Sequence, residues 1–280
     1  MTATAAPSEL DHKHHPDDIA GSTGLIGIIT DSLTESGRHL RIIPRNIELL
    51  IFATIQPVMF VLLFSFVFGG SIQTPPGFTD YDQYLMPGIF AQTVVFGSAF
   101  TSIGIAEDMS KGFIDRLRSL PIAQSSVLIG RTLSDVVRNA ITFVTMLLVA
   151  FLLGFRFEGS LLGALGATAL LLFFSYGLSW VQALIGLSVS SVEAANSAGF
   201  IWMFPITFVS SAFIDTSNLQ YAWLRTVADW NPFTQVTNAA RALYNGNDPG
   251  DAVMTSILWA VGMIVLFAFL ATRKFNQISD

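Results

Sequence analysis

Long apolar runs constrain the fold of this chain more than any other feature of its sequence. A membrane-spanning helix needs about 20 mostly apolar residues, and six segments meet this requirement: 49–68, 84–106, 136–155, 161–188, 195–213 and 252–272. Only 12% of the 280 residues are charged, about half the share in a soluble domain. The sequence therefore predicts an all-α, polytopic membrane protein with six transmembrane helices, whose single transmembrane domain comprises residues 21–280.

The placement of basic residues predicts the orientation of these spans. Eleven of the 14 Lys and Arg residues lie before the first span, around the connection between the second and third spans, or after the sixth. This group includes Arg131 and Arg138, which we place at the edge of the third span. Because Lys and Arg concentrate in cytoplasmic segments, we expect a multi-pass protein of the cell membrane with both termini in the cytoplasm.

Three segments outside the spans have recognisable patterns. Residues 1–20 are polar and contain prolines and histidines, which predicts a disordered cytoplasmic tail. Residues 22–43 have apolar side chains at near-helical spacing, which predicts an interfacial helix along the cytoplasmic surface. The segment 215–251 contains Trp223 and Trp230, and such residues favour the headgroup level. We expect one or two short re-entrant or surface helices there, on the outer side.

Residues 107–121 form a charged, amphipathic segment between two apolar runs. A helix would place Met109, Phe113, Leu117 and Leu120 along one stripe. One interpretation is a helix on the membrane surface in contact with anionic lipid. The other is a helix at 107–120 that docks into a groove of a cytoplasmic protein, which better explains an apolar stripe flanked by charges of both signs. The docking residues would be Glu107, Asp108, Lys111, Phe113, Asp115, Arg116, Leu117 and Arg118.

Two features inside the spans are candidates for function. Gln56 and Pro57 lie in the middle of the first span, where a proline kinks the helix; the kink serves packing or forms a hinge. An aromatic and thioether stripe on the fifth span could be faced by residues of the second. Such a stripe either contacts lipid and core or lines an apolar substrate path. The path candidates are Phe90, Thr93, Phe200, Met203, Phe204 and Phe208.

Other residues have mainly structural interpretations. Ser191, Ala195 and Gly199 follow a small-residue spacing that brings helices close together, either within the chain or in a dimer. Glu193 is expected in a solvated turn. Asn231 and Pro232 indicate a turn, and Arg241 would anchor a surface helix.

Several function classes are disfavoured. The sequence has no Walker A, HExxH or GxSxG pattern and no cysteine, so we expect no nucleotide hydrolysis, no metal and no cofactor in this chain, and no nucleic acid partner. An ion- or proton-coupled secondary carrier would need intramembrane carboxylates or an internal repeat. We identify neither in the sequence.

Several short motifs occur in a fixed order along the six spans. They are Arg38 to Pro44, Gln56-Pro57, Glu107 to Gly112, Asp115 to Pro121, Gly130-Arg131, Asn231 to Thr234, and Arg241 to Gly246. In this order the chain resembles the membrane subunit of an ABC-2 type exporter, and most of all the daunorubicin-resistance-type permeases. The resemblance extends from about Thr30 to Lys274.

The resemblance implies a mechanism and a set of partners. The segment 107–120 would be the coupling helix, which sits in a cleft of a separate ATPase, and 22–43 would be the connecting helix. The segment 215–251 would close an extracellular gate. Two membrane subunits, identical or paralogous, would line one path with spans two and five. Two ATPase chains would bind ATP and Mg²⁺, and the cargo would be an amphiphilic drug or lipid in contact with membrane lipid. A permease for a cell-surface polysaccharide remains the alternative.

Overall fold

The computed structural model describes residues 47–68, 74–78, 80–112 and 124–279, and within these ranges the chain is built from helices and short connections. The tail predicted at 1–20 and the interfacial helix predicted at 22–43 lie outside the described residues. The helices, in chain order, are α2 (Ile47–Leu62), the π-helical η3 (Leu63–Phe68), α3 (Tyr81–Ser110), α5 (Gln124–Leu152), α6 (Leu161–Gly186), α7 (Val192–Ile201), α8 (Met203–Phe208), the short η4 (Thr216–Asn218), α9 (Ala222–Trp230), α10 (Pro232–Asn245) and α11 (Ala252–Ser279).

Four helices in the described part of the chain are long and apolar enough to cross a membrane. They are α3, α5 from Val127, α6, and α11 as far as Gln277, and they correspond to the second, third, fourth and sixth predicted spans. The prediction of an all-helical membrane protein is confirmed to this extent. The first predicted span corresponds to α2 and η3, of which 55–67 is a shorter apolar helix.

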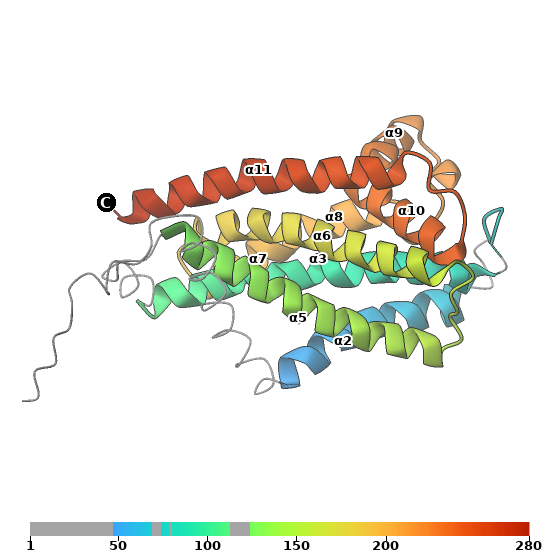
Figure 1. Ribbon diagram of the computed structural model, residues 1–280, viewed down its shortest axis with the longest axis horizontal. Coiled ribbons are helices and arrows are strands. Elements are labelled where there is room, and N and C mark those ends of the chain that lie inside the picture. Colours follow the sequence, from blue (N-terminus) through green and yellow to red (C-terminus); the bar gives the residue numbers. More distant parts are fainter. Residues whose placement is uncertain (1–46, 69–73, 79, 113–123, 280) are drawn as a thin grey trace, which may run out of the picture.

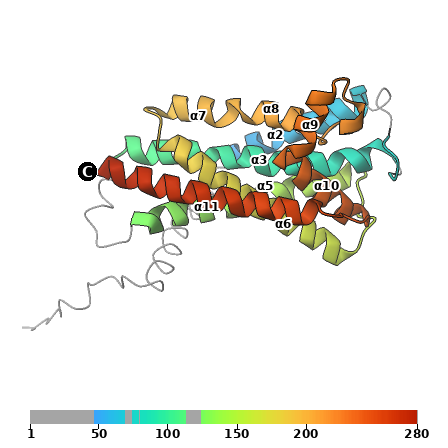
Figure 2. The same cartoon turned by 90° about the horizontal axis from the view of Figure 1, so that it is seen from above.

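The fifth predicted span, 195–213, is divided into two helices. α7 ends at Ile201, Trp202 forms a turn, and α8 begins at Met203. Pro205 explains the break, because it has no backbone N–H to donate to the carbonyl of Ile201. Figure 2 shows α7 and α8 following one another in nearly the same direction, so the pair still runs along the length of the bundle.

The third span begins earlier than the sequence pattern indicated. α5 starts at Gln124 rather than at Val136 and ends at Leu152 rather than at Phe155. Arg131, which we placed at the cytoplasmic edge of the span, therefore lies inside a continuous helix. The boundary was misplaced because we read charged residues as marking the membrane surface, whereas here they face a neighbouring helix.

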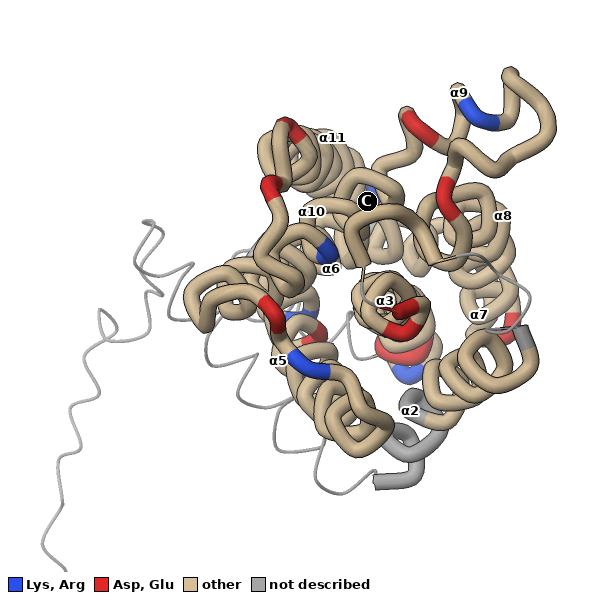
Figure 3. The backbone as a smooth tube through the Cα atoms, turned by 90° about the vertical axis from the view of Figure 1, so that its right-hand side faces the viewer, with Lys and Arg blue, Asp and Glu red and all other residues tan. Residues whose placement is uncertain are grey.

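α3 is the central helix of the bundle. It contacts α2, α5, α6, α7, α8 and α10, and Figure 3 shows it surrounded by these elements. Most of its length is buried, including small residues such as Ala91, Ala99 and Ser102. Small side chains let helix backbones approach closely in a membrane, so this composition suits a helix with neighbours on every side.

The two ends of the bundle differ. The end of α3, the start of α5 and the end of α11 lie together at one end in Figure 1. The two short helices of the 215–251 segment, α9 and α10, lie at the opposite end, beside the start of α3. The segments that the sequence assigns to the cytoplasm and to the outside are thus at opposite ends of the molecule.

Arg241 is buried at the end where α10 packs, rather than on a surface helix as the sequence suggested. Only 4% of it is exposed. Its guanidinium donates to the carbonyl oxygens of Tyr84 at 2.9 Å and Ser211 at 2.8 Å, and it lies 3.6 Å from the centre of the Tyr84 ring. The Tyr84 hydroxyl donates to the same Ser211 carbonyl at 2.8 Å. Arg241 therefore joins α10 to α3 and to the irregular segment after α8.

Asn231 provides hydrogen bonds to backbone groups at both ends of the connection between α8 and α10. Its Oδ1 accepts from the backbone N–H of Phe233 at 2.9 Å, which caps α10, and its Nδ2 donates to the carbonyls of Ile206 and Val209 at 2.7 and 2.6 Å. Backbone groups without partners are very unfavourable at membrane depth. These contacts explain how the chain can leave the helical conformation between α8 and α9.

Replacing Arg241 with Met should destabilise the protein by about 3 kcal/mol or more, because several buried carbonyls lose their donor. Thermal unfolding of the purified chain in detergent measures this as a lower midpoint. The control is Arg225→Met on α9, which is exposed and should change stability by less than about 0.5 kcal/mol. Equal midpoints for the two variants would show that the Arg241 contacts do not hold this end together.

Candidate functional site

The predicted coupling segment begins inside α3. Glu107 and Asp108 lie in the last turn of α3, so they do not start a separate helix as the sequence suggested. Lys111 caps the helix, its ammonium pairs with the Glu107 carboxylate at 3.2 Å, and Gly112 ends the helix with a left-handed φ of 62°. The remaining coupling candidates lie outside the described residues: Phe113, Asp115, Arg116, Leu117 and Arg118.

A cluster of buried charges joins α3 to α5 close to this end. The Asp135 carboxylate accepts from the Thr101 hydroxyl at 2.6 Å and pairs with Arg138 at 2.9 Å and Arg131 at 3.6 Å. Arg131 also pairs with Asp108 at 3.3 Å. We call these five residues the polar seam. The Asp135 side chain is only 3% exposed, so its charge is compensated inside the protein by two guanidinium groups rather than by water.

The polar seam adds to two inferences from the sequence. Arg131 and Arg138, which we counted among the basic residues of the cytoplasmic side, both face α3 from within α5. Asp135 is a buried carboxylate on a helix long enough to cross a membrane, and the sequence analysis did not identify it. The spacing of 131, 135 and 138 is that of one helical face, and this signal would have indicated the cluster if the start of α5 had been placed correctly.

Two glycines of α3 make room for polar side chains of α5. A Cβ at Gly104 would overlap the guanidinium of Arg131, and one at Gly97 would overlap the amide of Asn139. Asn139 donates to the Ser175 hydroxyl of α6 at 2.6 Å, and Ser175 donates to the Val94 carbonyl at 3.1 Å. The three helices α3, α5 and α6 are therefore joined by hydrogen bonds beyond the seam.

Phenylalanine rings from four helices form an aromatic ladder on another side of α3. Phe96 lies 5.1 Å from Phe204 and 5.9 Å from Phe200, and Phe208 lies 6.0 Å from Phe60, as measured between ring centres. Phe204 and Phe208 are 41% and 47% exposed. The aromatic ladder, made of Phe60, Phe96, Phe100, Phe200, Phe204 and Phe208, thus has one buried ring, Phe96, and partly exposed rings at its other positions.

A cavity of about 110 Å³ lies beside this ladder, between α2, α3, α5 and α7. Its lining brings together the predicted hinge residues and two of the predicted path residues. The lining residues are Gln56, Pro57, Gln92, Thr93, Phe96, Gly97, Phe100, Thr142 and Phe200. Sequence reasoning missed Gln92, Phe96 and Phe100, because a helix that is buried on all sides has no apolar periodicity that distinguishes one face.

Two of the predicted path residues lie in the core. Phe90 is fully buried and packs against Phe143, Phe155 and Tyr244, with ring centres 5.3–5.6 Å apart. Phe90 lies in the first half of α3, where α10 and α5 pack against it. Met203 is also fully buried, and its sulfur accepts from Gln182 at 3.8 Å. The stripe on the fifth span therefore divides, with Met203 inward and Phe204 and Phe208 outward.

The small residues of α7 pack within the chain. Ala195 and Gly199 are buried, the Ser102 hydroxyl of α3 donates to the Ala195 carbonyl at 3.3 Å, and Gln182 of α6 donates to the Gly199 carbonyl at 3.0 Å. This favours intrachain packing over a dimer contact. Glu193 is exposed in the first turn of α7, in agreement with the expected solvated position.

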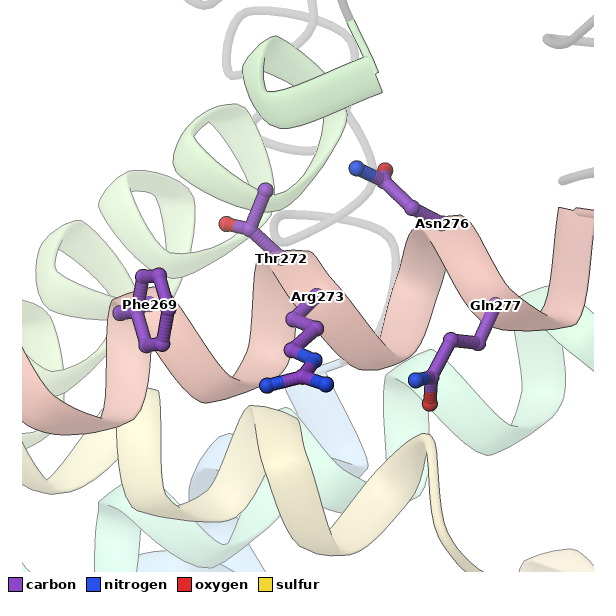
Figure 4. Close-up of a pocket in the computed structure, with 5 residues that line it drawn as sticks. All are labelled: Phe269, Thr272, Arg273, Asn276 and Gln277. Carbon is purple, nitrogen blue, oxygen red and sulfur yellow. The ribbon is translucent and has the colours of Figure 1, made fainter.

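Two larger cavities in the described part of the chain have no lining that indicates a catalytic or metal site. A cavity of about 350 Å³ is lined in the described part of the chain by Phe269, Thr272, Arg273, Asn276 and Gln277, all from the last turns of α11 (Figure 4). A second, of about 260 Å³, lies at the opposite end near Tyr84 and Arg241. Among the described residues there is no group of three or more His, Cys, Asp or Glu side chains that could hold a metal ion.

Comparison with known proteins identifies the family. Residues 34–245 match the family described as ABC-2 type transporter. The chain is 31% identical over 228 residues to the daunorubicin resistance ABC transporter permease protein DrrB1 of Streptomyces coeruleorubidus. The matched region covers 81% of this chain and 80% of the relative. It is 22% identical over 241 residues to a protein of Mycobacterium tuberculosis named probable doxorubicin resistance ABC transporter permease protein DrrC, with 86% of each chain covered.

Replacing Asp135 with Ala should destabilise the protein by about 3 kcal/mol, because two partly buried guanidinium groups lose their shared counter-charge. Thermal unfolding in detergent measures the change. The matched control is Glu107→Ala, which removes a carboxylate from an exposed pair and should cost less than about 1 kcal/mol. If both variants unfold at the wild-type midpoint, the polar seam does not stabilise the contact between α3 and α5.

Proposed function

This chain belongs to the ABC-2 type transporter family, and on that premise we propose that it exports a small amphiphilic drug or lipid with energy from two cytoplasmic ABC ATPase subunits. The chain is a membrane subunit of an ABC exporter, so ATP and Mg²⁺ would be bound by the ATPase chains. A second copy of this chain, or a paralogue, would complete the transport path.

We propose the full six-span topology on the same basis. α2 with η3 would be the first span, and α7 with α8 would be the fifth, because each pair runs along the bundle beside α3 (Figure 2). α9 and α10 would be short outer helices before the last span. Both termini would be cytoplasmic, which is supported by the position of the α11 end beside the end of α3 (Figure 1).

The segment 107–120 would be the contact with the ATPase. It begins in the last turn of α3 and leads to α5, and the polar seam joins these two helices close to it through the Asp108–Arg131 ion pair and the hydrogen bond from Thr101 to Asp135. A displacement of the segment would therefore be transmitted to α3 and α5 as one body. The helices on the other side of α3, namely α2, α7 and α8, have no such ion pairs to α3 among the described residues.

The aromatic ladder is the observation that most supports an apolar or amphiphilic cargo. Phe204 and Phe208 are exposed beside Ile201, which is 72% exposed, so the surface next to these rings is itself apolar. A path for a polysaccharide would be expected to place polar groups beside its aromatic residues. A secondary carrier would need a carboxylate that changes its charge, whereas Asp135 is paired with two arginines.

ATP-driven transport of daunorubicin tests the proposed function. The compound is chosen because the name of one relative contains it. Inverted membrane vesicles that contain this chain and its ATPase should accumulate daunorubicin only when ATP is added. Vesicles without this chain are the control. Accumulation that follows an imposed proton gradient and not ATP would favour a secondary carrier instead.

Cysteine labelling should distinguish a water-accessible path from a lipid-facing surface in this cysteine-free chain. A water-soluble thiol reagent should label Phe204→Cys, and daunorubicin should slow the labelling. Leu148→Cys is the control, because Leu148 is 59% exposed on α5 and should face lipid, which excludes the reagent. If the two positions react alike and daunorubicin has no effect, the ladder does not line a path.

Removing the apolar stripe of the predicted coupling helix should separate the permease from its ATPase. The double variant Phe113→Ala with Leu117→Ala should co-purify less ATPase and export less than a tenth of the wild-type amount, since both side chains would be buried in the docking groove. Ser119→Ala, which lies off the stripe, should behave like the wild type. Normal co-purification and export by the double variant would contradict the docking interpretation.

A further inference from the structure

Gln92 has a buried side chain whose hydrogen-bonding groups are unused. It lies in the middle of α3, it is 2% exposed, and neither its amide nitrogen nor its amide oxygen has a hydrogen-bond partner. Buried polar groups are nearly always paired, and an unpaired amide is unfavourable. Its presence in a helix that must pack on every side therefore needs an explanation.

Gln92 lines the 110 Å³ cavity between α2, α3, α5 and α7. The hydroxyls of the neighbouring lining residues Thr93 and Thr142 already donate to backbone carbonyls of their own helices, at 2.8 and 3.2 Å. A hydroxyl that has donated its proton can only accept. The amide of Gln92 thus differs from both threonines, because its donors and its acceptor are still available to a group that enters the cavity.

The rest of the lining suits an aromatic ring. Phe96, Phe100 and Phe200 contribute their rings to the wall, and aromatic rings pack well against one another edge to face or offset. The size of the cavity limits what can enter, because sites for whole drug-sized molecules are roughly 300–1,000 Å³ whereas a cavity of about 150 Å³ binds benzene. At about 110 Å³ the cavity is smaller than both, so it would hold at most one ring of a larger molecule.

The position of the cavity connects it to the aromatic ladder. Phe200 belongs to both and is half-buried, as is the lining residue Gln56 of α2. From Phe200 the ladder continues along α8 to the exposed Phe204 and Phe208. A molecule with one ring in the cavity could thus rest its remaining apolar surface on these two side chains.

We propose that the cavity is a subsite for one oxygen-bearing aromatic ring of the cargo, such as a phenol or quinone ring, and that Gln92 recognises the oxygen. The amide nitrogen would donate to a carbonyl or hydroxyl oxygen, and the amide oxygen would accept from a hydroxyl. The subsite rests on the proposed function, since it defines a class of exported molecule. A purely structural role for Gln92 predicts the opposite effect of mutation, because removal of a structural side chain lowers stability.

Direct binding tests the subsite without requiring transport. The full chain in lipid nanodiscs is titrated with 1-naphthol, whose hydroxyl-bearing ring would enter the cavity while its second ring rests on the aromatic ladder. Its fluorescence reports binding, and empty nanodiscs correct for partition into lipid. 1-Methylnaphthalene, which has the same ring system with a methyl group in place of the hydroxyl, is the matched probe. In the wild type, we expect 1-naphthol to bind about 5–10 times more tightly than 1-methylnaphthalene, as one net hydrogen bond provides.

The decisive variant is Gln92→Met, which keeps the length of the side chain and removes the amide. It should weaken 1-naphthol binding about 5–10-fold, leave 1-methylnaphthalene binding unchanged, and unfold at or above the wild-type temperature. Gln83→Met is the control, because Gln83 is also a buried glutamine of α3 with an unpaired amide oxygen but does not line the cavity.

Three results would overturn the proposal. The first is an equal affinity for the two probes in the wild type, which would mean that no hydrogen bond to the oxygen contributes to binding. The second is an unchanged 1-naphthol affinity in Gln92→Met, and the third is a lower unfolding temperature of that variant. A failure of ATP-driven export would count against the proposed function and would leave these binding results interpretable on their own.

Discussion

The polar seam fixes α3 against α5 through the hydrogen bond from Thr101 to Asp135 and the ion pair of Asp108 with Arg131, and the arrangement of the other helices depends on this contact. Charges inside a membrane protein must be paired within it, so the two helices cannot separate or slide without exposing a guanidinium or a carboxylate. Gly104 and Gly97 let the polar side chains of α5 reach the backbone of α3. The other faces of α3 are in contact with α2, α6, α7 and α10.

A second polar contact closes the opposite end of the bundle. Arg241 and Asn231 satisfy the backbone carbonyls where the chain leaves α8 and turns into α10. Between these two ends, Phe200 of α7 and Phe204 of α8 pack against Phe96 of α3, and the start of α7 is joined to α3 by the hydrogen bond from Ser102 to Ala195. The cavity with Gln92 lies beside these rings. Among the described residues, the α5 side of α3 thus has an ion pair between helices, whereas the α7 and α8 side has the aromatic ladder.

The sequence was informative where a single physical rule dominated. Apolar length identified the spans at α3, α5, α6 and α11, and proline and tryptophan patterns indicated short helices in 215–251. It failed where a residue belongs to two patterns at once. Arg131 and Arg138 resemble charges that mark the membrane surface, and only the contact with α3 reveals that they are buried. Pro205 stands in an apolar run, so the break between α7 and α8 was hidden by hydropathy.

The predicted path residues are divided between the surface and the core, and the substrate path itself stays a prediction. Phe204 and Phe208 are exposed as a stripe would require, whereas Met203 turns inward and Phe90 packs under Tyr244. Periodicity can assign residues to one face of a helix, but it cannot tell which neighbour covers that face. Gln92 could not be distinguished from Gln83 by sequence at all, because the difference between them is a cavity formed by four helices.

Hydrogen exchange of the complex with its ATPase tests most directly whether α3 and α5 move as one body. Exchange is compared between the nucleotide-free complex and the complex trapped with ATP. The account predicts that amides around Thr101 and Asp135 keep the same protection in both states, while exchange changes in α2 near Pro57 and at the junction of α7 and α8. A change centred on Thr101 and Asp135, with α2 and the junction unaffected, would contradict it.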